Sequence, residues 1–245
     1  MQFNYQSYLK LLSLLKENAY SFADYHNWSE KQRCVILRHD IDNSPEKALE
    51  MAMLEYSEGV QSTYFVLLTS DFYNIFSKRT IECLRTIRKY RHEVGIHFDE
   101  TQYEIANTEE YAFLIKKEAS ILSEAIGVPI TTVSMHRPSE NTLETNLEIP
   151  GMVNSYSRLF FKEFKYLSDS RRHWREPVEE IVRSNQYERL HILTHAFWYS
   201  KQEQSIHDTV YRYVNSANME RYLTYKNNIS DMDSIMMKGE VLCIK

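Results

Sequence analysis

The sequence predicts an α/β fold in which a mostly parallel sheet of about seven strands is closed, or nearly closed, as a barrel. Short runs of β-branched and aromatic residues alternate with longer segments whose apolar residues recur at helical spacing. The 245 residues, 43% of them hydrophobic, suit one globular domain. Within that domain we expect a helical extension over residues 1–30 and a helical segment and tail over residues 200–245.

The first strand and the helix after it have the clearest boundaries. A Cys-Val-Ile-Leu run predicts a strand over residues 33–39. The next helix is expected over residues 44–58, because Pro45 suits a first helical turn and Gly59 suits a stop. Its buried stripe is predicted to consist of four apolar residues, Leu49, Ala52, Met53 and Tyr56.

Two further strands follow in the first half of the chain. Residues 61–68 are rich in β-branched and aromatic side chains and predict the second strand. Residues 93–98 predict the third, in which Gly95 indicates a position where a Cβ would not fit. A long helix is then expected, with a cap at Asn107 or the next residue and a stop at Gly127.

The second half of the chain carries four more strand candidates. They are expected over residues 130–135, 152–156, 165–167 and 189–193. A short helix is predicted after Pro177, and a longer one over residues 206–225. Parallel strands joined by helices have their carboxyl ends on one face of a barrel, so residues far apart in sequence meet there.

Composition and charge exclude several classes of protein. A formal net charge of -5 provides no basic surface for nucleic acid, and five glycines form no Gly-rich loop for a nucleotide phosphate. We find no signal peptide and no apolar run of transmembrane length, so we expect a cytoplasmic protein. Cys34, Cys83 and Cys243 lack the spacing of metal ligands and indicate a reducing compartment.

Polar residues of a few types recur where the predicted strands end. They are His39, Asp40, Asp42, His97, Asp99, His136, Arg137, Asp169 and His195. Carboxylates at such a junction repel each other unless a cation or a shared proton relieves the repulsion. Their recurrence predicts one metal or acid–base site. Asp42 alone, or the adjacent Asn43, is also explained as a cap of the next helix.

The order of these residues resembles that of a known family. Five motifs carry the resemblance: His-Asp-Ile-Asp from His39, Gly-Ile-His-Phe-Asp from Gly95, His-Arg-Pro from His136, Ser-Asp-Ser around Asp169 followed by Trp174, and Leu-Thr-His ending at His195. They are similar to motifs of the polysaccharide deacetylase superfamily, the NodB-homology or family 4 carbohydrate esterases. Within it, the sequence resembles a divergent branch associated with bacterial surface-polysaccharide gene clusters. The resemblance implies a deformed (β/α) barrel that hydrolyses N-acetyl groups on sugars.

The resemblance implies a role for each matching residue in the first three motifs. Asp40 matches the general base that takes a proton from the attacking water. Asp42 matches the metal-binding aspartate, although the family usually places the two aspartates side by side and Ile41 separates them here. His97 matches the first histidine ligand, and Arg137 resembles the arginine that orients the base.

The last two motifs imply an acid and a substrate wall. His195 resembles the histidine that protonates the leaving amine, and Asp169 resembles the acidic residue that tunes it. Trp174 resembles the aromatic residue that walls the substrate groove. We expect Trp198 to contact substrate as well. For His195, packing in an aromatic cluster with Phe197 and Trp198 is the alternative.

One ligand of the family is missing from this chain. The second histidine of the family usually follows the first by four residues, where this chain has Thr101. His136 is the best substitute, because it ends the neighbouring strand. His39 and Asp99 are the next candidates, and both are otherwise expected to contact substrate.

The expected cofactor is one divalent metal. Zinc suits mixed imidazole and carboxylate ligands best, with manganese, iron or cobalt as alternatives. The implied substrate is an acetylated sugar, a nucleotide-sugar or a lipid-linked glycan. Two alternatives stay open: the same metal site hydrolyses another amide or an ester, or the chain is a descendant without catalysis that binds a glycan or a partner enzyme.

Overall fold

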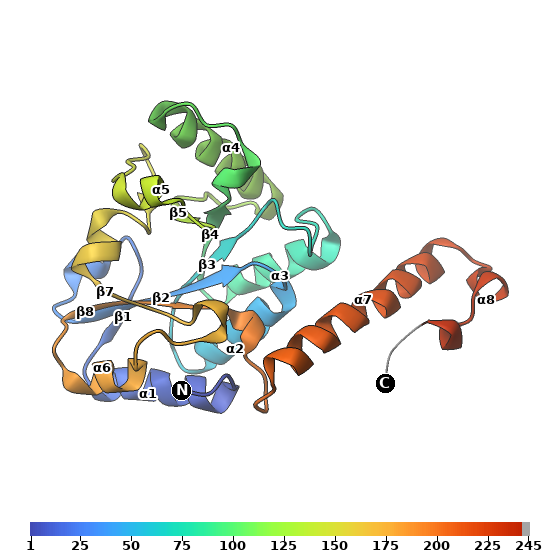
Figure 1. Cartoon of the computed structure of the whole chain (residues 1–245), viewed down its shortest axis with the longest axis horizontal. Helices are drawn as coiled ribbons and strands as arrows, with labels where there is room; N and C mark the ends of the chain where they lie inside the picture. Colours follow the sequence, from blue (N-terminus) through green and yellow to red (C-terminus); the bar gives the residue numbers. More distant parts are fainter. Residues whose placement is uncertain (242–245) are drawn as a thin grey trace. The chain divides into compact units, whose positions relative to one another are not determined.

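The computed structural model describes residues 1–241, and eight of its strands form one sheet (Figure 1). All seven strand pairings are parallel. Seven strands lie in the order β6-β5-β4-β3-β2-β8-β7, and β1 pairs with the first part of β2. The strands are β1 (Ser21–Ala23), β2 (Cys34–Ile41), β3 (Thr63–Val66), β4 (Glu93–Phe98), β5 (Thr132–Met135), β6 (Val153–Asn154), β7 (Lys165–Ser168) and β8 (Arg189–Thr194).

This sheet confirms the predicted α/β class and the seven predicted strands. β1 is an additional strand that was not predicted, because three residues are too few to show a β pattern. The sheet curls as a half barrel and, within residues 1–241, no pairing joins its edge strands β6 and β7. The fold is therefore consistent with a deformed (β/α) barrel that is open between these two strands.

Helices cover the outer face of the sheet (Figure 1). They are α1 (Tyr5–Glu17), α2 (Pro45–Ser57), α3 (Lys78–Lys89), α4 (Thr108–Ile126) and α6 (Val178–Ser184). A further short helix, α5 (Glu140–Glu144), follows β5. Their ends follow the predicted local chemistry. The side chain of Asn107 caps α4 by accepting the N–H of Glu110 at 2.9 Å, and Gly127 ends the helix with a φ of 78°.

The two faces of the sheet carry separate apolar clusters. On the outer face, Val35 and Leu37 of β2 pack in the main core with residues of the helices. On the inner face, Cys34 and Ile36 pack with Phe65 of β3. Because successive residues of a strand face opposite sides, this alternation decides which polar residues at the end of β2 share a face.

The buried stripe of α2 differs from the predicted one. The helix buries Pro45, Ala48, Met51, Ala52 and Glu55. Met53 and Tyr56, which were predicted to be buried, are 49% and 48% exposed, so the prediction was wrong for these two. The observed stripe is rotated relative to the predicted one because it includes Glu55, a carboxylate that an apolar pattern does not identify as buried.

Gly95 lies on β4 where the chain has no room for a side chain. A Cβ at this position would lie 2.6 Å from Cε1 of Phe65 and 2.9 Å from the carbonyl oxygen of Thr132, which confirms the prediction. The guanidinium of Arg38 lies 5.3 Å from the centroid of the same Phe65 ring. Gly95 therefore makes room for the ring that supports Arg38.

The chain divides into two compact units, Met1–Lys201 and a second unit that begins at Gln202. The second unit contains α7 (Ile206–Asn228) and α8 (Met232–Ile235), and α7 confirms the helix predicted over residues 206–225. The small core of this unit is formed by Tyr222, Met232 and Val241. The sheet and all predicted site residues belong to the first unit.

Two other expectations concern the cysteines and membrane segments. Cys34 and Cys83 are buried free thiols, and Cys243 lies outside the described residues. Across the described part of the chain, no helix combines the length and apolar character needed to cross a membrane.

Candidate metal centre and active site

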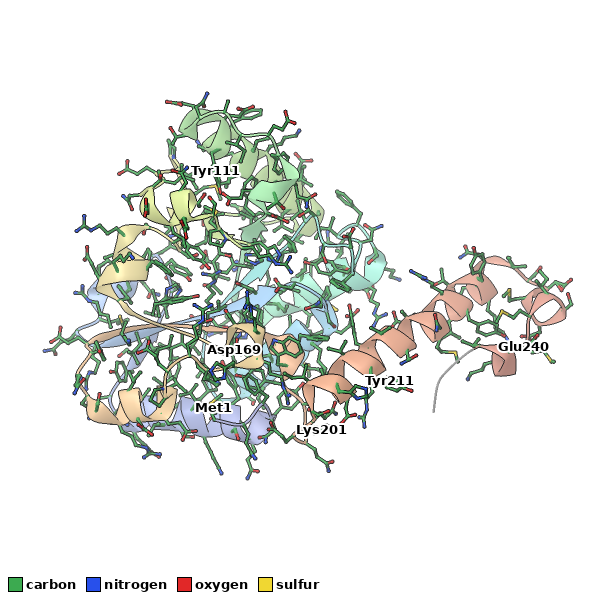
Figure 2. The ribbon with its side chains drawn as sticks, viewed as in Figure 1. Met1, Tyr111, Asp169, Lys201, Tyr211 and Glu240 are labelled. Carbon is green, nitrogen blue, oxygen red and sulfur yellow. The ribbon has the colours of Figure 1, made fainter. Side chains whose placement is uncertain are left out.

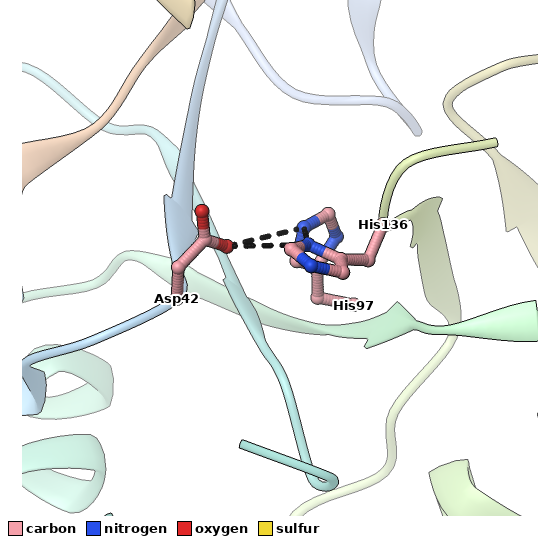
Figure 3. A group of neighbouring side chains, drawn as sticks. All are labelled: Asp42, His97 and His136. Atoms are coloured by element: carbon pink, nitrogen blue, oxygen red, sulfur yellow. Dashed lines mark hydrogen bonds and ion pairs between the residues drawn. The ribbon is translucent and has the colours of Figure 1, made fainter. Parts of the chain in front are cut away.

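Three side chains from the ends of different strands lie together (Figure 3). Asp42 follows β2, His97 belongs to β4 and His136 follows β5. Oδ1 of Asp42 is 3.4 Å from Nε2 of His97 and 3.6 Å from Nδ1 of His136, and these two nitrogens are 3.1 Å apart. The three ligand atoms all lie within 4.8 Å of one another, so the group could hold a metal ion.

The atoms of this group fit a divalent metal. Oδ1 of Asp42 is buried and has no hydrogen-bond partner among the described residues, which is costly for a carboxylate unless a cation reaches it. Nδ1 of His97 lies 2.6 Å from Oγ of Ser134, a contact that orients the ring and leaves Nε2 facing Asp42. Burial raises the pKa of Asp42, but His136 and His97 outweigh it and hold the pKa well below its usual range. The carboxylate is therefore ionised and available to a cation.

Asp40 lies beside this group and is bound by a buried arginine. Nε of Arg38 donates to Oδ1 of Asp40 at 2.9 Å, and Nη2 donates to Oδ2 at 2.8 Å. Oδ2 also lies 3.5 Å from Nε2 of His97. Burial raises the pKa of Asp40, but the charges of Arg38 and His97 outweigh this effect and lower the pKa below its usual value.

The arginine that binds and orients Asp40 is thus Arg38, whereas the sequence had led us to expect Arg137 in this role. The Arg38 guanidinium lies 4.7 Å from the ring centroid of Tyr156, which adds to its contact with Phe65. Arg137 is exposed, and its side chain has no hydrogen bond or ion pair among residues 1–241. A signal for Arg38 existed in the sequence, since strand alternation places residues 38, 40 and 42 on one face.

A second charged pair, His195 and Asp169, also lies beside the group. Nδ1 of His195 donates to Oδ1 of the fully buried Asp169 at 2.7 Å, and the backbone N–H of His195 also points to this carboxylate. Nε2 of His195 lies 3.9 Å from Oδ2 of Asp42. Burial lowers the pKa of His195, but Asp169 outweighs burial and raises the pKa to about 9. The imidazole therefore carries a proton at neutral pH on the nitrogen that faces Asp42.

His39 faces the opposite side of β2 from Asp40. Its Nε2 lies 2.8 Å from Oε1 of Glu55 on α2, and its Nδ1 lies 2.6 Å from Oγ1 of Thr194. Glu55 is wholly buried and also accepts hydrogen bonds from the hydroxyls of Tyr8 and Tyr64 at 2.5 Å and 2.7 Å. This network corrects the expectation that His39 contacts substrate or serves as a reserve ligand. The physical reason is strand alternation, which directs residue 39 to the helices.

Glu55 is a buried residue that sequence reasoning missed. A usable signal was present, because Glu55 follows Met51 and Ala52 at helical spacing on an apolar stripe. A carboxylate at such a position predicts buried hydrogen-bond donors.

Asp99 also differs from its expected place. Its Oδ1 accepts hydrogen bonds from the backbone N–H and the hydroxyl of Thr101, at 3.1 Å and 2.7 Å, and its Oδ2 accepts one from Gln102 at 3.2 Å. Asp99 therefore caps a short 3-10 turn over Glu100–Gln102, and it is not a member of the three-residue metal group. Thr101, at the position of the family's second histidine, supports this cap.

The two tryptophans expected at the substrate are partly buried and pack against the main core. Trp198 lies in the turn after His195, and its ring centroid is 4.9 Å from that of Phe197. The indole N–H of Trp174 is buried and has no acceptor in the described part of the chain. Contact of these rings with a substrate stays a prediction.

Comparison with known proteins found similarity to solved structures. No family model matches the sequence, and no curated protein matches it. A chitin deacetylase from Colletotrichum lindemuthianum is 14% identical at a TM-score of 0.46, over 74% of this chain and 81% of that one. The peptidoglycan deacetylase PdaC from Bacillus subtilis is 16% identical at a TM-score of 0.44, over 68% and 76%.

A CE4 family pseudoenzyme from Bacillus anthracis is also similar. It is 12% identical at a TM-score of 0.45, and the match covers 68% of this chain. This chain spans 56% of the length of that protein. At such identities and TM-scores, the similarity transfers neither an activity nor a residue's role to this chain.

Proposed function

We propose that this chain is a metal-dependent hydrolase that removes an N-acetyl group from a sugar or a polysaccharide precursor. One observation carries the proposal: a buried carboxylate, Asp40, and a protonated imidazole, His195, both lie beside the group of Asp42, His97 and His136. Amide hydrolysis needs a base for water and an acid for the departing nitrogen. The resemblance of the sequence motifs to the NodB-homology deacetylases supports an N-acetyl sugar as substrate.

We assign the metal to Asp42, His97 and His136. Two imidazoles and one carboxylate favour zinc, although manganese, iron and cobalt accept the same ligands. When bound, such a metal lowers the pKa of water towards neutrality and polarises the amide carbonyl. Ser134 holds the ring of His97 in the orientation that this role requires.

The residues of the chain itself move two protons. Asp40 accepts a proton from the attacking water, while Arg38 keeps the carboxylate ionised and in one orientation. His195 donates its Nε2 proton to the amine nitrogen as the C–N bond breaks. Asp169 stabilises the imidazolium through Nδ1 and thereby directs the other nitrogen to the site.

Glycan binding without hydrolysis is the second candidate, and one observation favours it. Both oxygens of Asp40 accept hydrogen bonds from Arg38, and the lowered pKa of Asp40 makes it a weaker base. Each carboxylate oxygen has further lone pairs, so the pairing weakens the base without blocking it.

Acetate release by zinc-loaded protein tests the proposal. We expect release from N-acetylglucosamine oligomers and a loss of roughly 100-fold or more in Asp40→Asn, whose side-chain amide cannot accept the proton. The metal content of Asp40→Asn should stay unchanged. Asp208→Asn, an exposed change in the second unit, is the matched control. Acetate release from esters alone would favour another hydrolase, and glycan binding with no release would favour the second candidate.

We also propose that the substrate is a precursor of a surface polysaccharide and that the chain acts in the cytoplasm. The buried free thiols of Cys34 and Cys83 support a reducing compartment. Fractionation of the source cells, followed by detection of the chain with an antibody, tests the location.

A further inference from the structure

We propose that the loop over residues 169–177, between β7 and α6, binds a phosphate group carried by the substrate. The inference rests on the proposed function and narrows the substrate to an acetylated sugar that bears a phosphate ester or a diphosphate. The charge of the loop, the left-handed backbone of Arg171 and Arg172, and the contact of Asp169 with His195 each support it.

The loop carries positive charge that its own carboxylates do not neutralise. One carboxylate, Asp169, pairs with His195, and the other, Glu176, lies 2.6 Å from Nζ of Lys165. Arg171 and Arg175 are exposed, and neither side chain has an ion pair or hydrogen bond among residues 1–241. Two guanidinium groups of this loop are therefore available to an anion.

Backbone conformation distinguishes the arginines near the site. Within residues 1–241, six residues other than glycine have a positive φ. Three of them, Ala19, Arg91 and Asn185, lie at the carboxyl ends of helices, where a left-handed residue is common. The other three are all arginines, with φ values of 48°, 60° and 56°: Arg137, Arg171 and Arg172.

These strained arginines follow strands whose ends build the site. Arg137 comes directly after the candidate ligand His136. Arg171 lies two residues after Asp169, which is labelled in Figure 2 and binds His195. A left-handed backbone is unfavourable for a residue with a Cβ, and such strain is concentrated at ligand-binding positions. The strain therefore favours a role for these loops in binding rather than in folding.

The chemistry of the guanidinium group identifies the ligand. It binds phosphate through two parallel N–H donors and stays charged at any physiological pH. A nucleotide-linked or lipid-linked sugar carries its diphosphate directly on the sugar ring. Binding of that diphosphate by Arg171 and Arg175 would hold the acetamido group of the sugar near Asp40 and His195.

Calorimetric binding to zinc-loaded protein tests the inference. The probes are UDP-N-acetylglucosamine, a farnesyl-diphosphate-linked N-acetylglucosamine and the neutral chitotetraose, at about 50 mM salt so that screening is weak. The variants are Arg171→Gly and Arg175→Ala, and Arg183→Ala, an exposed arginine of α6, is the matched control. Glycine accepts the left-handed conformation, so Arg171→Gly removes the guanidinium without adding strain.

We expect wild type to bind at least one diphosphate sugar more tightly than chitotetraose, and the preferred probe identifies the carrier. Arg171→Gly should raise the melting temperature yet weaken that binding about tenfold, as loss of a charged hydrogen bond predicts. A residue with a purely structural role would not produce this combination. Arg175→Ala should weaken binding similarly, and Arg183→Ala should change nothing.

Equal binding of charged and neutral probes by wild type would overturn the inference. So would unchanged diphosphate binding in both loop variants. The affinity for each probe and the release of acetate are measured separately, so the outcome of the binding test is distinct from that of the proposed hydrolysis. Diphosphate binding without acetate release would leave the loop site standing and reject the hydrolase. Acetate release together with unchanged diphosphate binding in both arginine variants would support the hydrolase and reject the loop site.

Discussion

Arg38 and Asp40 form a buried ion pair in which the guanidinium donates to both carboxylate oxygens, at 2.9 Å and 2.8 Å. The two residues are separated by one position in β2, so they share the inner face of the strand. Asp40 is also 3.5 Å from a candidate metal ligand, His97. The pair therefore connects the stability of the sheet to the chemistry of the site.

Replacement of Arg38 should destabilise the fold strongly. Arg38→Met leaves the Asp40 carboxylate buried without its partner, which typically costs about 3–5 kcal/mol. Urea unfolding monitored by circular dichroism measures the change in the free energy of unfolding. Arg137→Met, an exposed control, should change it by less than about 0.5 kcal/mol.

The double variant Arg38→Met with Asp40→Leu should recover much of the lost stability, because it removes the unpaired charge. The account of this pair would be wrong if Arg137→Met proved more destabilising than Arg38→Met.

Loss of His195 should affect amides more than activated esters. The proton on Nε2 is needed when an amine leaves, whereas a phenolate leaves without one. His195→Ala should therefore slow acetate release from an N-acetyl sugar by roughly 100-fold, with a much smaller effect on an aryl acetate. Comparable losses on both substrates would instead assign His195 to orientation of the site or to binding of the oxyanion.

Glu118 should make stability depend on pH. This residue of α4 is buried, Oε2 has no hydrogen-bond partner among residues 1–241, and burial raises the pKa of Glu118 to about 7 from 4.5. As pH rises through this interval, the unfolded chain loses the proton first, so the contribution of Glu118 to stability should fall and then stay constant above pH 7. Glu118→Gln lacks this contribution, so its stability relative to wild type should rise from pH 4.5 to about pH 7 and reach about 1–3 kcal/mol at pH 8.

Thermal and urea unfolding from pH 4.5 to pH 8 measure the stability of wild type and Glu118→Gln. These limits span the ordinary pKa of a glutamate, 4.5, and the raised pKa of Glu118 in the folded protein, about 7. Glu124→Gln, an exposed change on the same helix, should follow the wild-type curve. A pH-independent difference between wild type and Glu118→Gln would show that the carboxyl is not protonated in the folded state.

The sequence predicted much of the fold because its strands and helices have strong local patterns. The runs before Asp42, His97 and His136 are long enough to show as strands, and parallel topology then brings their ends together. β1 escaped prediction because its three residues form a strand only by pairing with β2. The buried stripe of α2 was predicted wrongly because it contains Glu55. A charged residue is expected on the exposed face of a helix, but Glu55 is buried with hydrogen-bond partners.

Orientation of side chains at the strand ends was harder to predict. Strand alternation separates His39 from Asp40, and it applies to any strand once the register is known. The direction of Arg137 depends instead on a left-handed backbone after β5, which no hydrophobic pattern encodes. The cap made by Asp99 likewise depends on the path of the loop after β4.

Metal content is the most direct test of the central claim, which is that Asp42, His97 and His136 hold one divalent metal. Elemental analysis after zinc loading and dialysis should find about one zinc per chain in wild type. Asp42→Ala, His97→Ala and His136→Ala should each lose the metal, and Asp99→Asn, a nearby carboxylate outside the group, should keep it. The claim would be contradicted if wild type bound no zinc, manganese, iron or cobalt, or if His136→Ala retained the metal at the wild-type level.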